Sequence, residues 1–171
     1  ITWNREMSRI FYSRCVACHR EGGTAFSMTE YRETFPWGTA IKEEVLERRM
    51  PPWGAVKGFG DFRNDQALTP EQLELITSWS QGGSPEGEAK DLAASDKLTE
   101  MMKESAWYSA PRSVRRSGEI VAKGDFKLTK RFVIDGLFPQ NVPENGSFQI
   151  VAELPDGQIE PLVWLEGYKQ Q

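Results

Sequence analysis

The pentapeptide CVACH at residues 15–19 contains every cysteine and every histidine of this 171-residue chain. In the C-x-x-C-H arrangement, both thiols add to the vinyl groups of a haem and the histidine ligates the iron. One helical turn spans the two vinyl groups, so a helix is expected to lead into the first cysteine. The pentapeptide therefore predicts one covalently attached haem c, with Cys15 and Cys18 as attachment points and His19 as the proximal iron ligand.

Three other interpretations of this pentapeptide have less support. A structural zinc site needs about four Cys or His ligands, and the chain has three such residues. A thioredoxin-like redox pair belongs in a βαβ context, whereas the residues before Cys15 have helical spacing. A disulfide between cysteines three positions apart closes a very short loop and adds little stability.

Covalent haem attachment implies assembly outside the cytoplasm, so we expect a periplasmic or otherwise exported protein. The start at Ile1 rather than Met suggests a processed N-terminus. With 21 basic and 25 acidic side chains the net charge is −4, which gives no electrostatic reason to expect nucleic acid or an anionic membrane as a partner. No run reaches the roughly 18 apolar residues of a transmembrane segment.

Hydrophobic spacing predicts helices over most of the first half of the chain. A first helix runs from about Asn4 and ends at Cys15. A second is amphipathic, begins at Pro36 and stops only at the sequence MPPW of residues 50–53, where proline disfavours helical angles. A third has Thr69 as N-cap, a capping box, and two glycines at its end.

The pattern changes in the second half. A short helix is expected at about residues 96–107, followed by period-two segments typical of strands. These expected strands are residues 119–126, 127–135, 147–154 and 158–167, with a Pro-Asp-Gly turn between the last two. The predicted fold class is therefore α+β, with an all-α cytochrome c-like haem domain at residues 1–95 and a bridging helix plus a small antiparallel β unit at residues 96–171.

The distal iron ligand decides between electron transfer and chemistry at the iron. The chain has no second histidine, so ligation of the iron by two imidazoles would require a histidine from another chain. The five candidate thioethers are Met7, Met28, Met50, Met101 and Met102. Met50 is favoured because it ends a helix, precedes two stiff prolines and has Trp53 beside it to exclude water. A different methionine, an open position or an exogenous ligand stays possible.

Three separated motifs of the first 90 residues resemble the monohaem c-type cytochrome domains of bacterial exported proteins. That family has C-x-x-C-H, then M-P-P-W some thirty residues later, then a helix ending W-x-x-x-G-x-P-x-G. The matching positions here are Cys15, Cys18, His19, Met50, Pro51, Pro52, Trp53, Trp79, Gly83, Pro85 and Gly87. The resemblance implies Met50 as the axial ligand. Such domains often occur fused to others, including copper-dependent monooxygenase-like ones, whose copper-binding histidines this chain lacks.

Trp53 and Phe62 flank the expected ligand segment and are the predicted haem contacts. Basic side chains in reach of the haem propionates are Arg20, Arg48, Arg49, Lys57 and Arg63. The predicted function is single-electron transfer between redox partner proteins, without enzymatic activity of its own. Two rivals stay open: a five-coordinate haem sensor or peroxidase-like enzyme, and a haem-bearing subunit that docks onto a larger redox complex through the β unit.

Overall fold

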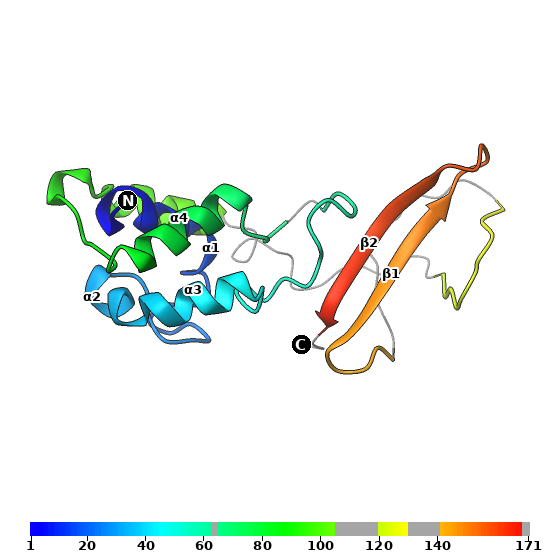
Figure 1. The fold of residues 1–171 in the computed structure, drawn as a ribbon, viewed down its shortest axis with the longest axis horizontal. Coiled ribbons are helices and arrows are strands. Elements are labelled where there is room, and N and C mark those ends of the chain that lie inside the picture. The colour runs from blue at the N-terminus through cyan, green and yellow to red at the C-terminus, as the bar shows by residue number, and fades with distance from the viewer. Residues whose placement is uncertain (63–64, 105–119, 130–140, 169–171) are drawn as a thin grey trace.

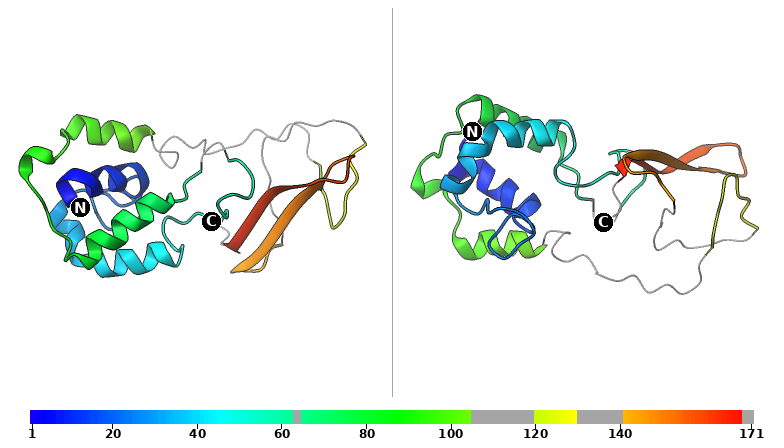
Figure 2. Two further views of the ribbon diagram at one scale, coloured as in Figure 1. Left: turned by 45° about the horizontal axis from the view of Figure 1, so that its top comes forward. Right: turned by 90° about the horizontal axis from the view of Figure 1, so that it is seen from below.

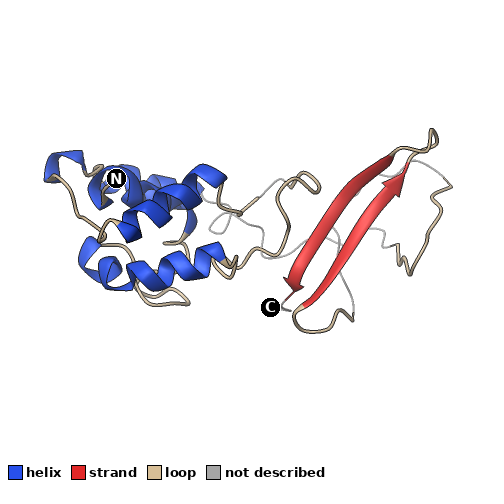
Figure 3. Ribbon diagram, viewed as in Figure 1, coloured by secondary structure: helices blue, strands red, loops and turns tan. Residues whose placement is uncertain are grey.

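The chain folds into a group of helices followed by a β hairpin (Figure 1, Figure 3). This is a computed structural model, and it describes residues 1–62, 65–104, 120–129 and 141–168. The helices occupy the first of these ranges and most of the second, and the two strands pair antiparallel in the last. The predicted α+β class is confirmed. No helix in the described part of the chain is long and apolar enough to cross a membrane.

The first helix leads directly into the cysteine pair, as predicted. It begins as a single π turn, η1 (Trp3–Met7), and continues as α1 (Ser8–Arg14), with Cys15 as its C-cap. Its inner side is closed to solvent, because Met7 and Phe11 have no exposed surface. The side chains that fix this helix in the core therefore also fix the position of the first cysteine.

The next helical stretch is made of three consecutive pieces. They are α2 (Tyr31–Thr34), the 3-10 turn η2 (Phe35–Trp37) and α3 (Gly38–Leu46). The sequence predicts one helix from Pro36 to Met50. The last four residues of that prediction are wrong, because α3 ends at Leu46.

A Schellman motif ends α3 early. Arg48 takes a left-handed backbone conformation with φ of 56°. The Arg48 amide then donates to the Val45 carbonyl at 3.2 Å, and the Arg49 amide donates to the Glu44 carbonyl at 2.9 Å. Residues 47–62 consequently form a long loop, called here the Met50 loop, rather than the end of a helix.

The third predicted helix is confirmed as α4 (Pro70–Gln81). The Thr69 hydroxyl accepts from the Gln72 backbone amide, and the Gln72 side-chain carbonyl accepts from the Thr69 backbone amide. These two bonds complete the predicted capping box. Ile76 and Trp79 on its inner face are each 1% exposed. The Trp79 ring meets Phe11 edge-on at 6.2 Å between centroids, so α4 and α1 share one core.

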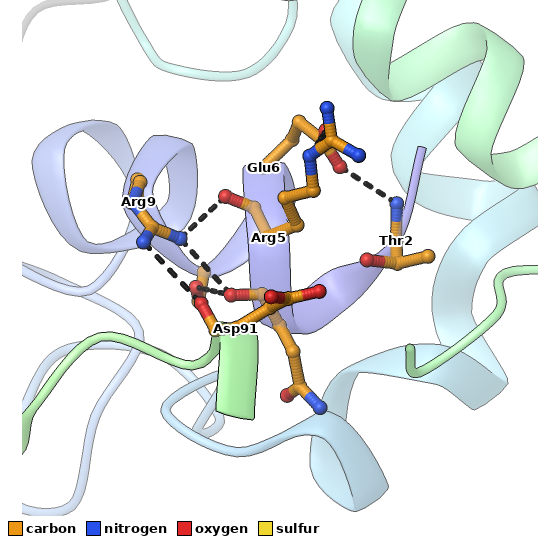
Figure 4. Close-up of polar contacts among 7 residues, drawn as sticks. Thr2, Arg5, Glu6, Arg9 and Asp91 are labelled. Carbon is orange, nitrogen blue, oxygen red and sulfur yellow. Dashed lines mark hydrogen bonds and ion pairs between the residues drawn. The ribbon is translucent and has the colours of Figure 1, made fainter. Parts of the chain in front are cut away.

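After α4 the chain returns to the N-terminus and holds it in place. The amides of Trp3 and Asn4 each donate at 2.9 Å to carbonyls of this returning segment, those of Pro85 and Glu86. Arg9 extends the attachment by donating to the carbonyl of Asp91, the last residue of η3 (Ala89–Asp91), as Figure 4 shows. The N-terminal helix is therefore fixed by backbone bonds as well as by its apolar face.

The last helix, α5 (Ser95–Glu104), lies against α1. Leu98 is 6% exposed, and Met102 packs on the core cluster. The sequence predicts a helix over residues 96–107, which the structure confirms for the part up to residue 104; residues 105–107 lie outside the described part. The sequence assigns this helix to the C-terminal unit, yet its contacts are with α1.

Two strands make up the sheet: β1 (Gly146–Glu153) and β2 (Ile159–Tyr168). Gln149 pairs with Trp164 and Ile150 with Val163 in antiparallel register. The predicted turn is confirmed, since the Leu154 amide donates to the Gln158 carbonyl at 2.8 Å across the Pro-Asp-Gly sequence. Figure 2 shows the pair of strands as a long twisted ribbon.

The other two predicted strands have a different outcome. Residues 120–126 carry period-two spacing, but the described residues of this segment form no strand and are exposed throughout. A segment that alternates apolar and polar residues but buries neither face gains no packing energy from pairing as a strand. The prediction for residues 119–126 is therefore wrong over residues 120–126, whereas that for 127–135 falls largely on residues 130–140, outside the described part.

Candidate functional site

The two cysteines lie in a tight turn that continues from α1. The amides of Cys18 and His19 both donate to the Cys15 carbonyl, at 3.1 and 2.9 Å, which keeps the backbone coiled through the motif. Val16 is 1% exposed and anchors this turn in the core. Both thiols are free. Burial raises the pKa of the Cys15 thiol to about 12, so that thiol is neutral at neutral pH.

His19 is held with one ring nitrogen toward the backbone. Its Nδ1 lies 3.0 Å from the carbonyl oxygen of Phe26. A carbonyl can only accept, so Nδ1 carries the proton and donates, and the lone pair of Nε2 is left for a ligand. Backbone carbonyls orient metal-binding histidines in this way. This hydrogen bond therefore favours the tautomer that an iron ligand requires.

Residues 15–28, called here the motif loop, fold back on themselves behind His19. The Ala25 amide donates to the Cys18 carbonyl at 3.2 Å, and the Met28 amide donates to the His19 carbonyl at 3.1 Å. The return depends on Gly23, because a Cβ at this position would lie 2.2 Å from the Cys18 carbonyl oxygen. The sequence analysis did not single out this glycine, although the Gly-Gly pair after the motif is a visible signal.

An aromatic row leads from His19 to α3. The rings of His19 and Phe26 meet edge-on at 5.0 Å between centroids, and those of Phe26 and Trp37 lie 4.9 Å apart. Phe26 is 49% exposed and Trp37 is 48% exposed. The two adjacent rings make a small apolar surface that is open to solvent. The row begins at the imidazole, so a flat apolar ligand at His19 would cover it.

Met50 differs from the other four methionines in its exposure. It is 41% exposed, whereas Met7 and Met28 belong to the buried core, Met102 packs against that core, and Met101 is half-buried. The Met50 amide donates to the Glu44 carbonyl at 3.1 Å, which ties the residue to the end of α3. Among the five thioethers, Met50 is therefore the one both exposed to solvent and fixed at its backbone.

The two predicted haem contacts, Trp53 and Phe62, lie together in the Met50 loop. Their rings meet edge-on at 5.8 Å between centroids, and both side chains are half-buried. The ring contacts of the described residues do not link this pair to the aromatic row beginning at His19. Their role as haem contacts stays a prediction.

The Met50 loop also pairs with the β hairpin. The Val56 amide donates to the Trp164 carbonyl at 2.8 Å, and the Glu166 amide donates to the Gly54 carbonyl at 2.9 Å. Ala55 is thus bridged to Leu165 in antiparallel sense. The loop and β2 lie side by side in Figure 1. The sequence did not predict this pairing, because the paired segment, residues 54–56, is too short to show an alternating strand pattern and begins with a glycine.

The basic side chains predicted to reach the haem propionates are mostly paired with other protein groups. Arg49 forms an ion pair with Glu44 at 2.8 Å, and Lys57 pairs with Asp65. Arg14, which the sequence analysis did not consider, donates from Nη1 to the Asp65 carbonyl at 3.1 Å. Its Nε is buried without a hydrogen-bond partner among the described residues. Arg20 donates to its own loop, Arg48 is exposed, and Arg63 lies outside the described part.

These residues fit a covalently attached haem. The cysteine pair ends a helix with both thiols free, the imidazole presents Nε2, exposed aromatic rings stand beside it, and an unpaired arginine Nε lies next to the first cysteine. The described residues hold no cluster of three His, Cys, Asp or Glu that would bind a metal by protein ligands alone. No known protein family, curated protein or solved structure matches the chain.

Proposed function

We propose that this protein is an exported monohaem c-type cytochrome that carries single electrons between redox partner proteins. The observation that carries the proposal is the placement of His19, whose Nδ1 lies 3.0 Å from the Phe26 carbonyl oxygen directly after two free cysteines. When bound, the haem supplies an iron that accepts and releases one electron.

Cys15 and Cys18 hold the cofactor in this proposal. Their two thiols would attach a haem by addition to its vinyl groups, in which each thiol would give its sulfur to one vinyl carbon and its proton to the neighbouring one, with no net oxidation. The helix end and the buried Val16 keep the two sulfurs on one rigid turn. Residues that are already ordered lose little entropy when they hold a ligand.

Met50 is proposed as the distal ligand. Its exposure and its backbone bond to Glu44 support this role, and the two prolines after it restrict the chain. A haem held by the Met50 thioether and the His19 imidazole would have a higher reduction potential than one held by two imidazoles. Electron transfer then requires no general acid, base or nucleophile from the chain, only a partner that approaches the cofactor edge.

The test compares visible spectra and carbon monoxide binding of the wild-type protein with those of Met50→Ala. Wild type is expected to contain one covalent haem per chain, to show the weak far-red sulfur-to-iron band in the ferric state, and to bind carbon monoxide poorly. Met50→Ala is expected to lose the band and bind carbon monoxide readily. Met28→Leu is the matched control, because Met28 is a buried core methionine.

The outcomes separate the rival functions. A chain without covalent haem after expression with a haem-attachment system contradicts the proposal as a whole. A wild-type protein that lacks the far-red band and binds carbon monoxide keeps the haem but favours a five-coordinate sensor or peroxidase-like enzyme. Loss of the band in Met28→Leu rather than in Met50→Ala would show that Met28, and not Met50, is the distal ligand.

A further inference from the structure

The Met50 loop is fixed at both sides of Met50, by two different parts of the molecule. On one side the Met50 amide donates to the Glu44 carbonyl at the end of α3. On the other side, beginning at Gly54, the backbone pairs with β2 through two hydrogen bonds of 2.8 and 2.9 Å. Only three residues, Pro51, Pro52 and Trp53, lie between these attachments.

Side chains strengthen the second attachment. The ring of Phe59 meets that of Trp164 edge-on, with 4.9 Å between centroids. Next to it Gly60 has a φ of +83°, and a Cβ there would lie 1.9 Å from the Leu162 carbonyl oxygen. Ala55 and Val163 are 8% and 4% exposed. The loop and the strand therefore meet closely, and one residue from each, Ala55 and Val163, is buried.

We infer that the β hairpin positions the distal ligand, with Trp164 as the principal positioning residue, so that a change in the hairpin changes how firmly Met50 is held. This inference rests on the proposed function for its effect at the iron. Its mechanical basis is independent of it: proline has a fixed φ, so two consecutive prolines reduce the number of ways in which residues 51–53 can absorb a displacement of Gly54 before it reaches Met50.

The same connection operates in reverse. A ligand that holds Met50 in one place reduces the freedom of residues 51–53 and thereby favours the pairing of residues 54–56 with β2. Coupling between two sites is reciprocal in free energy. A redox partner that binds the hairpin would accordingly alter the strength of the Met50 ligand without touching the cofactor.

The experiment uses the full chain with and without haem. Trp164→Ala removes the ring that Phe59 contacts, Trp164→Phe restores an aromatic ring, and Phe59→Ala removes the same contact from the loop side and leaves the hairpin sequence intact. Ile159→Ala is the matched control, because Ile159 lies on the same strand, is 60% exposed and pairs with Glu153 at the turn end.

Two readouts are followed in every variant. In haem-free protein, hydrogen exchange over residues 53–62 is expected to rise about 3- to 10-fold in Trp164→Ala and Phe59→Ala, the range that an aromatic pair contributes. In haem-loaded protein, the far-red band is expected to weaken and carbon monoxide binding to become stronger by a similar factor. Trp164→Phe should keep most of the wild-type protection from hydrogen exchange and most of the far-red band. Ile159→Ala should match wild type in both readouts.

The outcomes distinguish this inference from the proposed function. If wild type carries no covalent haem, the proposed function fails, and the positioning role fails with it. If wild type shows the far-red band but the band and carbon monoxide binding are unchanged in both ring variants, the positioning role alone is overturned. If Trp164→Ala does not fold, Phe59→Ala decides.

Discussion

At the scale of single residues, the site depends on a few positions where no larger side chain fits. Gly23 is the clearest, because the motif loop passes so close to the Cys18 carbonyl that a Cβ would meet its oxygen at 2.2 Å. The bond from the Ala25 amide to the same carbonyl closes the loop. The orientation of the His19 imidazole, which depends on Phe26, is therefore determined partly by a residue without a side chain.

Gly23→Ala is expected to destabilise the protein by about 1–3 kcal/mol, because the backbone must move to relieve the contact. The displaced Phe26 carbonyl should also reduce the yield of covalently attached haem. Urea denaturation and the haem-to-protein ratio measure the two effects. Thr24→Ala, an exposed neighbour, is the control, and equal results for both variants would show that Gly23 does not determine the loop.

At the scale of elements, one carboxylate organises the start of α2. The Glu33 side chain accepts from the Ser27 hydroxyl at 2.6 Å and from the Thr29 amide at 3.1 Å, and it completes a capping box with Glu30. The hydrogen bond from Ser27 is the largest cause of a lowered pKa for Glu33, followed among the stabilising bonds by that from Thr29. The carboxylate thus connects the motif loop to the helix that follows it.

A depressed pKa makes this contribution dependent on pH. Glu33 stabilises the folded state fully above the ordinary pKa of a glutamate, and the stabilisation disappears as the pH falls through the lower pKa of the folded state. Glu33→Gln is expected to lower the free energy of unfolding by about 0.5 kcal/mol at pH 7, a small value because solvent screens this exposed group. At strongly acidic pH the variant and wild type are expected to be equally stable. Urea denaturation at both pH values measures it.

Glu21→Gln, which changes another exposed carboxyl group of the motif loop, is the matched control for this experiment. A difference between wild type and Glu33→Gln that stays constant from neutral to acidic pH would contradict the assigned cause of the stabilisation.

Elements with local signals could be predicted from the sequence. The capping box of α4, the helix before Cys15 and the Pro-Asp-Gly turn each depend on residues within a few positions of one another. The end of α3 could not, because its Schellman motif uses Arg48 instead of the glycine that normally marks it. The pairing of Val56 with Trp164 could not either, since its partner is distant in sequence and its own segment is too short to show a period.

At the scale of the whole molecule, the helices and the hairpin meet at the Met50 loop. The core cluster lies among η1, α1, α3 and α4, with Met102 of α5 packed against it. The hairpin contributes no residue to that cluster and contacts the loop through Trp164 and Leu165 instead. The sequence could place Cys15, Cys18 and His19 directly after a helix, but not the strand that supports the Met50 loop, and the roles of these residues stay predictions.

Two truncations separate the contributions of α5 and the hairpin. A chain of residues 1–104 retains α5 and is expected to unfold cooperatively, but with fast hydrogen exchange over residues 53–62. A chain of residues 1–94 also loses the buried Leu98 and the packing of Met102, and is expected to be less stable than 1–104 by about 2–4 kcal/mol. Urea denaturation measures the difference, and equal stability would assign α5 to the C-terminal unit.

The pairing of Val56 with Trp164 also has a consequence for the order of folding. Contacts between segments about a hundred residues apart form late, because closing so long a loop costs entropy before the contact repays it. The turn at Cys15 and Cys18 uses only neighbouring residues and the core of α1. We therefore expect the turn at Cys15 and Cys18 to form before the Met50 loop is fixed against β2, so that the two cysteines reach their final arrangement while the distant half of the molecule is still unpaired.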